Sequence, residues 1–224
     1  MPLIDLHTHT KPLSHDSLLT PDDLIDAAKA SGLDGVCLTE HDFFWDNAAT
    51  DELVKRHNFT VIAGNEVNTE FGHILVFGLQ KFVFGMHRLA DLVRLVGEAG
   101  GAMIGAHPYR RQLPFELRDA GDWSAALEQT LRNESYVHVS AIETVNGRGT
   151  DRQNEFSLAV CERLGLPATA GSDSHEPMDV GRCATEFSAA IGGLGDLIAE
   201  LRAGRCRPVV LREAPPSKFR RVLD

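Results

Sequence analysis

The sequence has few of the features that mark a secreted or membrane protein. Its four cysteines lie far apart and form no C-x-x-C pair, a pattern typical of a reducing cytosol. No apolar run approaches the roughly 20 residues that a membrane helix requires, and no apolar leader follows the first residues. We therefore expect a soluble cytoplasmic protein without a membrane partner.

Positive charge is also scarce, with 22 lysines and arginines against 32 acidic residues and a formal net charge of -10. The summed field of such a chain repels a nucleic-acid backbone, so duplex nucleic acid is not an expected partner. A small phosphorylated substrate remains compatible with this charge, because one cleft can be basic on an acidic protein. The sequence gives no indication of the oligomeric state.

The composition, with 43% hydrophobic and 24% charged residues, is that of an ordinary globular protein. A chain of 224 residues buries about 70% of its unfolded surface, so it needs no metal merely to fold. Any bound metal is then expected to serve chemistry. We predict one domain over residues 1–212, followed by a tail over residues 213–224 that contains Pro215-Pro216 and several basic residues.

Amphipathic stretches predict several helices. The clearest begins after Thr20 as N-cap, with Pro21 in the first turn and Gly32 past the last turn. Apolar residues recur at helical spacing in four further stretches, the last of them weaker. These stretches are residues 89–96, 194–201, 152–164 and 123–131.

Seven short apolar runs alternate with these helices and predict an α/β protein. The runs are residues 3–6, 35–39, 61–64, 74–77, 102–106, 139–143 and 168–171. Continuous apolar runs are typical of strands covered on both faces. Seven such strands favour a barrel, with an open doubly wound sheet as the alternative.

Most of these runs end in a side chain that can bind metal. The residues are His7, His9, His41, Glu66, His107, Asp173 and His175. In a barrel the ends of parallel strands share one rim, and residues two apart on a strand point the same way. His73 precedes its strand, and an antiparallel hairpin between residues 61–64 and 74–77 would return it to Glu66.

Imidazoles and carboxylates crowded into one cleft cost free energy unless something positive neutralises them. Divalent metal ions do so, and the sequence therefore predicts a multinuclear metal site. Nitrogen and oxygen donors without cysteine suit zinc, manganese or iron better than magnesium.

Six motifs, taken together and in order, resemble those of the polymerase and histidinol phosphatase (PHP) family. They are Asp5-Leu6-His7-Thr8-His9-Thr10, Thr39-Glu40-His41-Asp42, Gly64-Asn65-Glu66, Gly72-His73-Ile74, Ala106-His107-Pro108 and Gly171-Ser172-Asp173-Ser174-His175. The resemblance implies a distorted seven-stranded (β/α)7 barrel. It also implies two or three divalent metals at the C-terminal rim of the strands and, usually, phosphoesterase activity.

The resemblance also divides the ligands among the metals. One metal takes His7, His9, Glu66 and Asp173, a second takes His41 and His175, and a third takes Glu66, His73 and His107. Glu66 is then a bridging ligand, and Glu66, Asp173 and His175 are the expected catalytic residues. For the remaining ligand the spacing favours His15, as in the members with three metals, with Asp16 as the alternative.

These residues predict a metal-dependent phosphatase or phosphodiesterase, in which a metal-activated hydroxide attacks a small ester resembling a nucleotide or histidinol phosphate. Arg110, Arg148 and Asn146 are the expected substrate-binding residues, because a guanidinium grips phosphate bidentately. Two alternatives are a non-catalytic PHP-like binding module and a metallo-amidohydrolase. The latter usually needs a lysine at a strand end, and no predicted strand ends in one.

Overall fold

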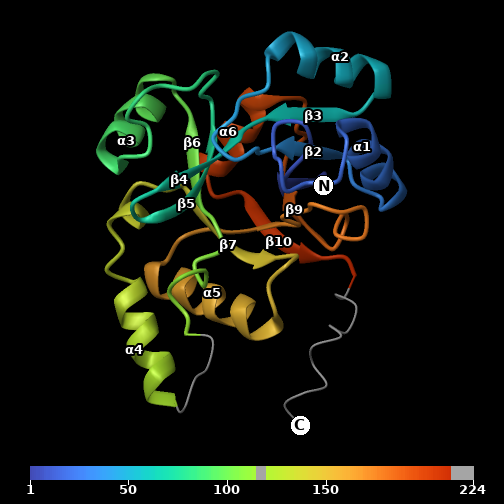
Figure 1. The fold of residues 1–224 in the computed structure, drawn as a ribbon. Coiled ribbons are helices and arrows are strands. Elements are labelled where there is room, and N and C mark those ends of the chain that lie inside the picture. Colours follow the sequence, from blue (N-terminus) through green and yellow to red (C-terminus); the bar gives the residue numbers. More distant parts are fainter. Residues whose placement is uncertain (115–119, 213–224) are drawn as a thin grey trace.

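The computed structural model describes residues 1–114 and 120–212, so the predicted tail lies outside the described residues. The strands form two five-stranded sheets (Figure 1). The first has the order β10 (Cys206–Val210), β9 (Cys183–Phe187), β1 (Leu3–Thr8), β2 (Gly35–Leu38), β3 (Thr60–Ala63). The second has the order β4 (Asn65–Thr69), β5 (Gly72–Phe77), β6 (Ala102–Gly105), β7 (Ala141–Asn146), β8 (Ala168–Gly171).

Both sheets are mixed. Strands β1, β2 and β3 are parallel, whereas β9 is antiparallel to both β1 and β10. In the second sheet, β5 is antiparallel to β4 and β6, and β6, β7 and β8 are parallel. Two isolated parallel bridges, Thr8 with Ser174 and His41 with Glu66, join the sheets just beyond strand ends.

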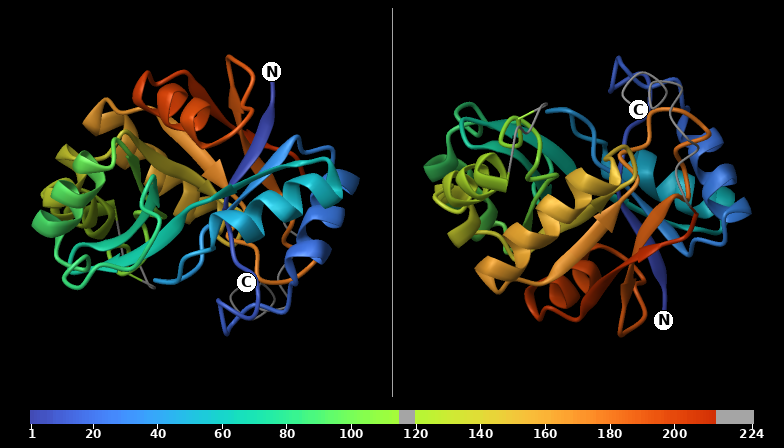
Figure 2. Two further views of the ribbon diagram at one scale, coloured as in Figure 1. Left: turned by 90° about the horizontal axis from the view of Figure 1, so that it is seen from above. Right: turned by 90° about the horizontal axis from the view of Figure 1, so that it is seen from below.

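In the described ranges, six α-helices lie around the outside of the two sheets (Figure 2). They are α1 (Pro21–Ala30), α2 (Asn47–His57), α3 (Leu89–Glu98), α4 (Ala120–Thr130), α5 (Asp151–Leu164) and α6 (Leu194–Arg202). A short 3-10 helix, η1 (Glu134–Val137), precedes β7. No helix in the described ranges is long and apolar enough to cross a bilayer.

Two of the helices begin at a capping box, which explains where they start. The Thr20 hydroxyl accepts from the backbone N–H of Asp23, whose carboxylate accepts from the Thr20 backbone, and Thr150 and Gln153 do the same for α5. Each box satisfies N–H groups that the first helical turn leaves without a partner.

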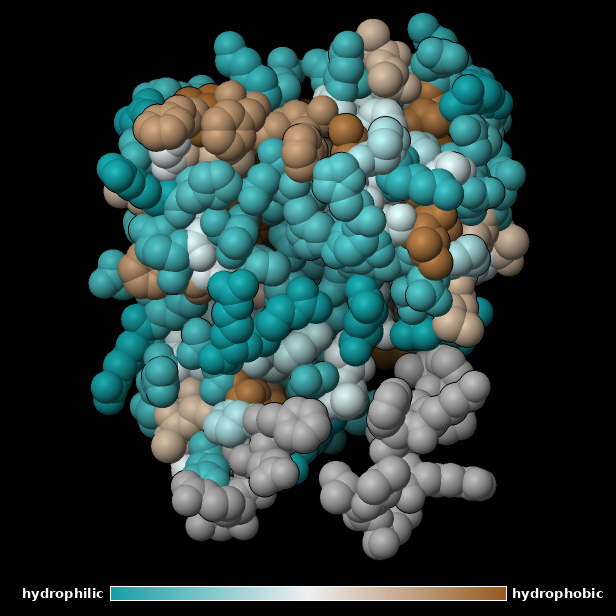
Figure 3. All heavy atoms as spheres, in the orientation of Figure 1, coloured by the Kyte–Doolittle hydropathy of each residue, from teal (hydrophilic) through white to brown (hydrophobic). Residues whose placement is uncertain are grey.

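The core has one cluster shared by both sheets and two clusters under the helices. Ile4 and Leu6 of β1 pack with Leu75 and Phe77 of β5 and Ile104 of β6, all at most 1% exposed. The outer clusters lie beneath α1 and α2 on one side and α3, α4 and α5 on the other. The surface shown in Figure 3 is mainly hydrophilic, with hydrophobic side chains in separate groups.

The predicted α/β class is confirmed, and the predicted seven strands correspond to β1, β2, β3, β5, β6, β7 and β8. A single closed seven-stranded barrel is not what the described residues form, because the strands fall into two mixed sheets. The sequence prediction missed α2 and three strands, β4, β9 and β10. Four of the five residues of β4 are polar, and Arg207 and Pro208 interrupt β10, so neither has a continuous apolar run.

The predicted hairpin was wrong in one of its strands. β3 pairs with β2, and the antiparallel partner of β5 is β4, which places Asn68 opposite His73. Only Gly64 separates the end of β3 from the start of β4, so the two strands look like one segment in the sequence.

Helix α5 provides a test of the core. Phe156 is fully buried and meets the ring of Trp123 edge-on with centroids 5.2 Å apart, whereas Leu158 on the same helix is 44% exposed. We expect Phe156→Ala to lower the free energy of unfolding by about 3–5 kcal/mol, because it leaves a cavity. Leu158→Ala is the control and should lower it by less than about 1 kcal/mol. Urea unfolding measures both, and equal losses would contradict this core assignment.

Candidate metal centre

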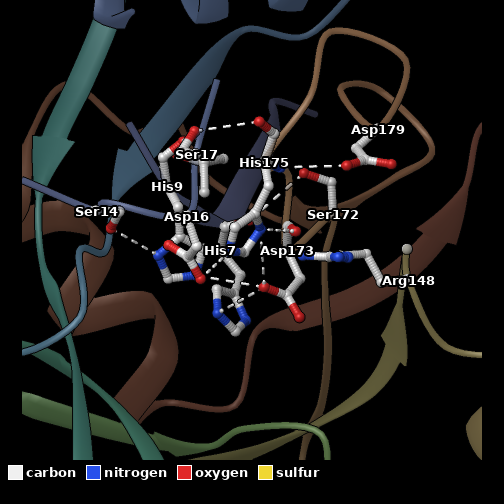
Figure 4. A network of polar contacts seen from close by, with 12 residues as sticks. His7, His9, Ser14, Asp16, Ser17, Arg148, Ser172, Asp173, His175 and Asp179 are labelled. Carbon is white, nitrogen blue, oxygen red and sulfur yellow. Dashed lines mark hydrogen bonds and ion pairs between the residues drawn. The ribbon is translucent and has the colours of Figure 1, made fainter. Parts of the chain in front are cut away.

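The ends of β1 and β8 meet at a seam that brings two pairs of donor side chains together. The backbone N–H of Asp173 donates to the carbonyl of His7 at 2.8 Å, and that of His9 donates to the carbonyl of Ser174 at 3.0 Å. His7 and His9 point to the same side of β1, as do Asp173 and His175 beyond β8 (Figure 4). Main-chain pairing therefore sets these side chains face to face.

Four buried atoms converge near this seam: His7 Nε2, His9 Nε2, Glu66 Oε2 and Asp173 Oδ1. None of them makes a well-directed hydrogen bond within the described chain, although His41 Nδ1 lies 2.8 Å from Glu66 Oε2. Each imidazole nitrogen lies 3.3–3.6 Å from both carboxylate oxygens. Four ligands bound tetrahedrally at about 2.0–2.2 Å lie about 3.3–3.6 Å from one another. The donor atoms thus have the spacing of a first coordination shell, and the residues fit a divalent metal.

The carboxylate of Glu66 joins this group to a second one. Its Oε1 lies 2.7 Å from His73 Nδ1 and 2.9 Å from His107 Nε2, while its Oε2 lies 2.8 Å from His41 Nδ1. The β4–β5 hairpin, in place of the one we predicted, brings His73 to this position. Each oxygen of Glu66 therefore faces a different set of imidazoles, which is the geometry of a bridging carboxylate.

A third group contains His9, His41 and His175. Asp16 Oδ2 lies 3.4 Å from His41 Nε2 and 3.2 Å from His175 Nε2. His15 is exposed and lies outside every donor group in the described chain, with its ring 6.2 Å from that of Phe43. The contacts of Asp16 with His41 and His175 favour Asp16, the predicted alternative, over His15 as the remaining ligand.

The buried carboxylates and imidazoles of the cluster shift one another's pKa values. Burial favours neutral Glu66 and Asp173, but the surrounding imidazoles outweigh it and keep both pKa values well below the ordinary range. Burial also lowers the pKa of His7, yet Glu143 and other carboxylates raise it well above its usual value. For His9 burial dominates and lowers the pKa to about 4. Neutral imidazole is the form that binds metal.

Glu143 supports two of these donors, a role that the sequence prediction missed. It is buried, its Oε1 lies 2.9 Å from His7 Nδ1, and its Oε2 accepts from the His107 backbone N–H at 2.9 Å. A carboxylate on the far nitrogen of a ligating histidine sets the ring's tautomer and orientation. The signal in the sequence was an acidic residue at the end of a predicted apolar strand.

Glu40 has a similar place behind His9. It accepts from the Ser14 hydroxyl, from the Thr10 backbone and from Trp45 Nε1, and Ser14 Oγ lies 3.3 Å from His9 Nδ1. Its position beside His41 in the sequence was the available signal.

The backbone at the centre is strained or tightly confined. His107 has a backbone φ of 27° and Asp173 a φ of 53°, values that residues other than glycine rarely adopt. Such strain persists only where the surroundings hold it, and it is common at functional sites. A Cβ at Gly171 would lie 2.4 Å from the His7 Cβ, so only glycine lets β8 approach β1 this closely.

The centre opens into a polar cleft of about 560 Å³, whose wall includes Asp16, His41, His175, Tyr109, Arg110 and Arg148. Arg110 Nη2 lies 2.9 Å from Asp173 Oδ2. The side chain of Arg148 has no ion pair or hydrogen bond with any described residue. Two of the three predicted substrate-binding residues therefore face the cleft.

Asn146 is the third and is 1% exposed. Its amide nitrogen donates to Glu143 Oε2 at 3.1 Å and to Asp173 Oδ2 at 3.3 Å. Its amide oxygen accepts from the Arg148 backbone N–H at 3.1 Å. The structure therefore places Asn146 behind the centre, where it orients Asp173 and the loop that carries Arg148.

Fold and site together define an α/β protein with a buried histidine–carboxylate centre for divalent metal. The family model for the PHP domain matches residues 5–142, more than half of the chain, and a model described as PHP-associated matches residues 151–206. The chain belongs to the PHP domain family. It is also 28% identical over 114 residues to the uncharacterized protein MJ1587 of Methanocaldococcus jannaschii, an alignment that covers 47% of this chain and 67% of that protein.

Solved structures share the fold. An amidohydrolase from Chromobacterium violaceum with bound sulfate and no metal has a TM-score of 0.62 at 20% identity, covering 93% of this chain and 98% of that one. A putative metal-dependent phosphoesterase from Bifidobacterium adolescentis has a TM-score of 0.57 at 16% identity, covering 90% and 96%. Histidinol phosphate phosphatase from Lactococcus lactis, complexed with zinc, L-histidinol and phosphate, has a TM-score of 0.50 at 17% identity, covering 78% and 87%.

The supporting role of Glu143 can be tested by Glu143→Gln. The amide keeps the size of the side chain, but its NH2 group must face either His7 or the His107 N–H, and one of those donors loses its acceptor. We expect affinity for Zn²⁺ or Mn²⁺ to fall about 10–100-fold, measured by competition with a chelator. Glu128→Gln, on the surface of α4, should leave the affinity unchanged. An unaltered affinity in Glu143→Gln would refute this role.

Proposed function

We propose that this protein is a metal-dependent phosphoesterase that hydrolyses a small phosphate ester. The observation that carries the proposal is the convergence of four buried donor atoms, none with a well-directed hydrogen bond among the described residues, at the spacing of a coordination shell. Membership of the PHP family supports a metal-dependent hydrolase, and two structural neighbours named as a phosphoesterase and a phosphatase favour phosphate esters as substrates.

Two or three divalent ions fit the donor groups. His7, His9, Glu66 and Asp173 would hold one, Glu66, His73 and His107 another, and His41 and His175 with Asp16 a third. Mixed nitrogen and oxygen donors suit zinc, manganese or iron, and the histidinol phosphate phosphatase neighbour carries zinc. When bound, such ions lower the pKa of a coordinated water and polarise a phosphoryl oxygen.

The chain's own residues then have separable tasks. Glu66, Asp173 and His175 hold and orient the centre, and the backbone strain at Asp173 fixes its carboxylate there. Arg148 offers the substrate phosphate an unpaired guanidinium, whereas Arg110 is already engaged with Asp173. A cleft with two guanidinium groups in its wall favours an anionic substrate.

The two alternative functions, a metallo-amidohydrolase and a non-catalytic binding module, are less well supported. The structural neighbour named as an amidohydrolase contains sulfate, an anion of phosphate-like shape. No lysine is among the described residues that line the metal cleft, although a metallo-amidohydrolase usually carbamylates one. A non-catalytic binding module would not need convergent donors, and the grouping of histidines and carboxylates in the described chain supports a catalytic centre instead.

The proposal is tested by elemental analysis combined with a phosphate-release screen. We expect two or three divalent ions per chain, and hydrolysis of small esters that ceases in Glu66→Ala, because both donor groups lose their shared carboxylate. Including p-nitrophenyl phosphate and bis(p-nitrophenyl) phosphate distinguishes a phosphatase from a phosphodiesterase. Glu162→Ala, on the exposed face of α5, is the control and should retain full activity. Fewer than one ion per chain after refolding in excess zinc or manganese would overturn the proposal.

Arg148 is tested with two substitutions. A planar guanidinium matches two phosphate oxygens and an ammonium does not, so both Arg148→Lys and Arg148→Ala should lower kcat/KM. The loss of a charge-assisted contact of about 1.5–3 kcal/mol corresponds to a fall of about 10–100-fold. Metal content should not change, because no hydrogen bond or ion pair joins the Arg148 side chain to a donor residue in the described ranges. Arg163→Ala, at the far end of α5, controls for the loss of one charge, and near-normal kcat/KM in Arg148→Ala would exclude the phosphate contact.

A further inference from the structure

A second polar pocket, of about 240 Å³, lies next to the metal cleft. Three guanidinium groups line it, from Arg110, Arg111 and Arg132, together with the amide side chains of Gln112 and Gln129. We call it the arginine pocket. Such a concentration of positive charge is unexpected on a chain whose formal net charge is -10.

Two of these guanidinium groups have no polar partner among residues 1–114 and 120–212. Arg111 and Arg132 form no side-chain hydrogen bond or ion pair with any residue in the described ranges, whereas most described arginines do. Glu70 also lines the pocket, but both of its oxygens accept from the Leu89 backbone N–H at the start of α3, at 3.0 Å each. This carboxylate, the one that the described residues place in the wall, thus already accepts a hydrogen bond from a helix end.

The wall around these arginines is built by fixed contacts. Asn133 donates from its side chain to the Phe71 carbonyl at 2.8 Å, which ties the segment after α4 to the β4–β5 turn. Arg111 has a φ of 67°, a conformation uncommon for a residue with a side chain. Unpaired cations held close together in this way repel one another, and an anion between them removes that cost.

The arginine pocket adjoins the metal cleft. Arg110 lines both of them. A hollow of about 20 Å³, room for about one water molecule, shares His73 with the cleft and Arg111 with the arginine pocket. A substrate with its phosphate at the metal centre would therefore have the arginine pocket beside it.

We propose that the arginine pocket binds a second anionic group of the substrate, at the opposite end from the ester that is hydrolysed. The substrate would then carry two anionic groups, either two phosphates or a phosphate and a carboxylate. This inference rests on the proposed function, because it uses the metal centre to hold the first phosphate. The amides of Gln112 and Gln129 supply further donors for either anion.

Alkane-diol phosphates of three to six carbons test this in the metal-loaded protein. We expect kcat/KM for the α,ω-bisphosphates, and for the matching ω-carboxyalkyl phosphates, to exceed that of the monophosphates about tenfold or more, as expected of charge-assisted contacts. Comparing the two dianionic series shows which anion the pocket prefers. Arg132→Ala should remove most of the advantage and leave monophosphate hydrolysis within about twofold of wild type, because Arg132 lies outside the metal cleft.

Arg94→Ala, on the surface of α3, removes one charge elsewhere and should preserve the advantage. The inference is overturned if wild type shows no preference for the dianionic esters, or if Arg132→Ala and Arg94→Ala reduce the preference equally.

Calorimetry with non-hydrolysable phosphonates separates this inference from the proposed function. Wild type should bind an α,ω-bisphosphonate more tightly than the monophosphonate of the same length, and Arg132→Ala and Arg111→Ala should bind the two alike. If no ester is hydrolysed but this difference persists, the arginine pocket stands and the phosphoesterase proposal fails. If esters are hydrolysed but the two phosphonates bind wild type alike, the phosphoesterase proposal stands and the arginine pocket fails.

Discussion

The constraint on which the rest of this structure depends is the burial of carboxylates among imidazoles. Glu66 and Asp173 are at most 1% exposed, and each keeps one oxygen without a well-directed hydrogen bond among the described residues. Placing such atoms inside a protein costs several kcal/mol unless positive charge meets them. The side chains behind them, from Glu143 and Glu40, hold the imidazoles in place rather than neutralise the centre. A divalent ion supplies the charge that this arrangement lacks.

The two sheets explain how one centre draws on so many parts of the chain. Main-chain hydrogen bonds join the end of β1 to the end of β8, and the end of β2 to β4, so donors distant in sequence meet at two seams. The hydrophobic core lies below these seams and needs no metal to form. The hydrophobic core thus stabilises the fold, and the strand ends above it carry the donor residues. Because the core supplies the stability, the cleft tolerates strained backbone at His107 and Asp173.

Charge is distributed unevenly around the centre, with acidic and imidazole groups inside it and guanidinium groups beside it. The donor cluster gathers carboxylates and imidazoles, whereas the cleft and the arginine pocket beside it are lined by guanidinium groups, on a chain that is acidic as a whole. A net negative surface repels most polyanions, while a local basic rim retains a small one. Arg110, paired with Asp173 and shared by both hollows, links the metal centre to that rim.

The sequence alone determined the α/β class, the main helices and most of the donors. Buried strands read as apolar runs, capping boxes mark helix starts, and ligands at strand ends stand out by their chemistry. Tertiary structure decided the rest. Four of the five residues of β4 are polar, and β4 follows β3 after Gly64, so only its pairing with β5 reveals it. Asp16 and His15 are neighbours in the chain, and only the tertiary structure shows that Asp16 contacts His41 and His175. Glu143 supports two histidines more than 30 residues away in sequence, a relationship that local patterns do not encode.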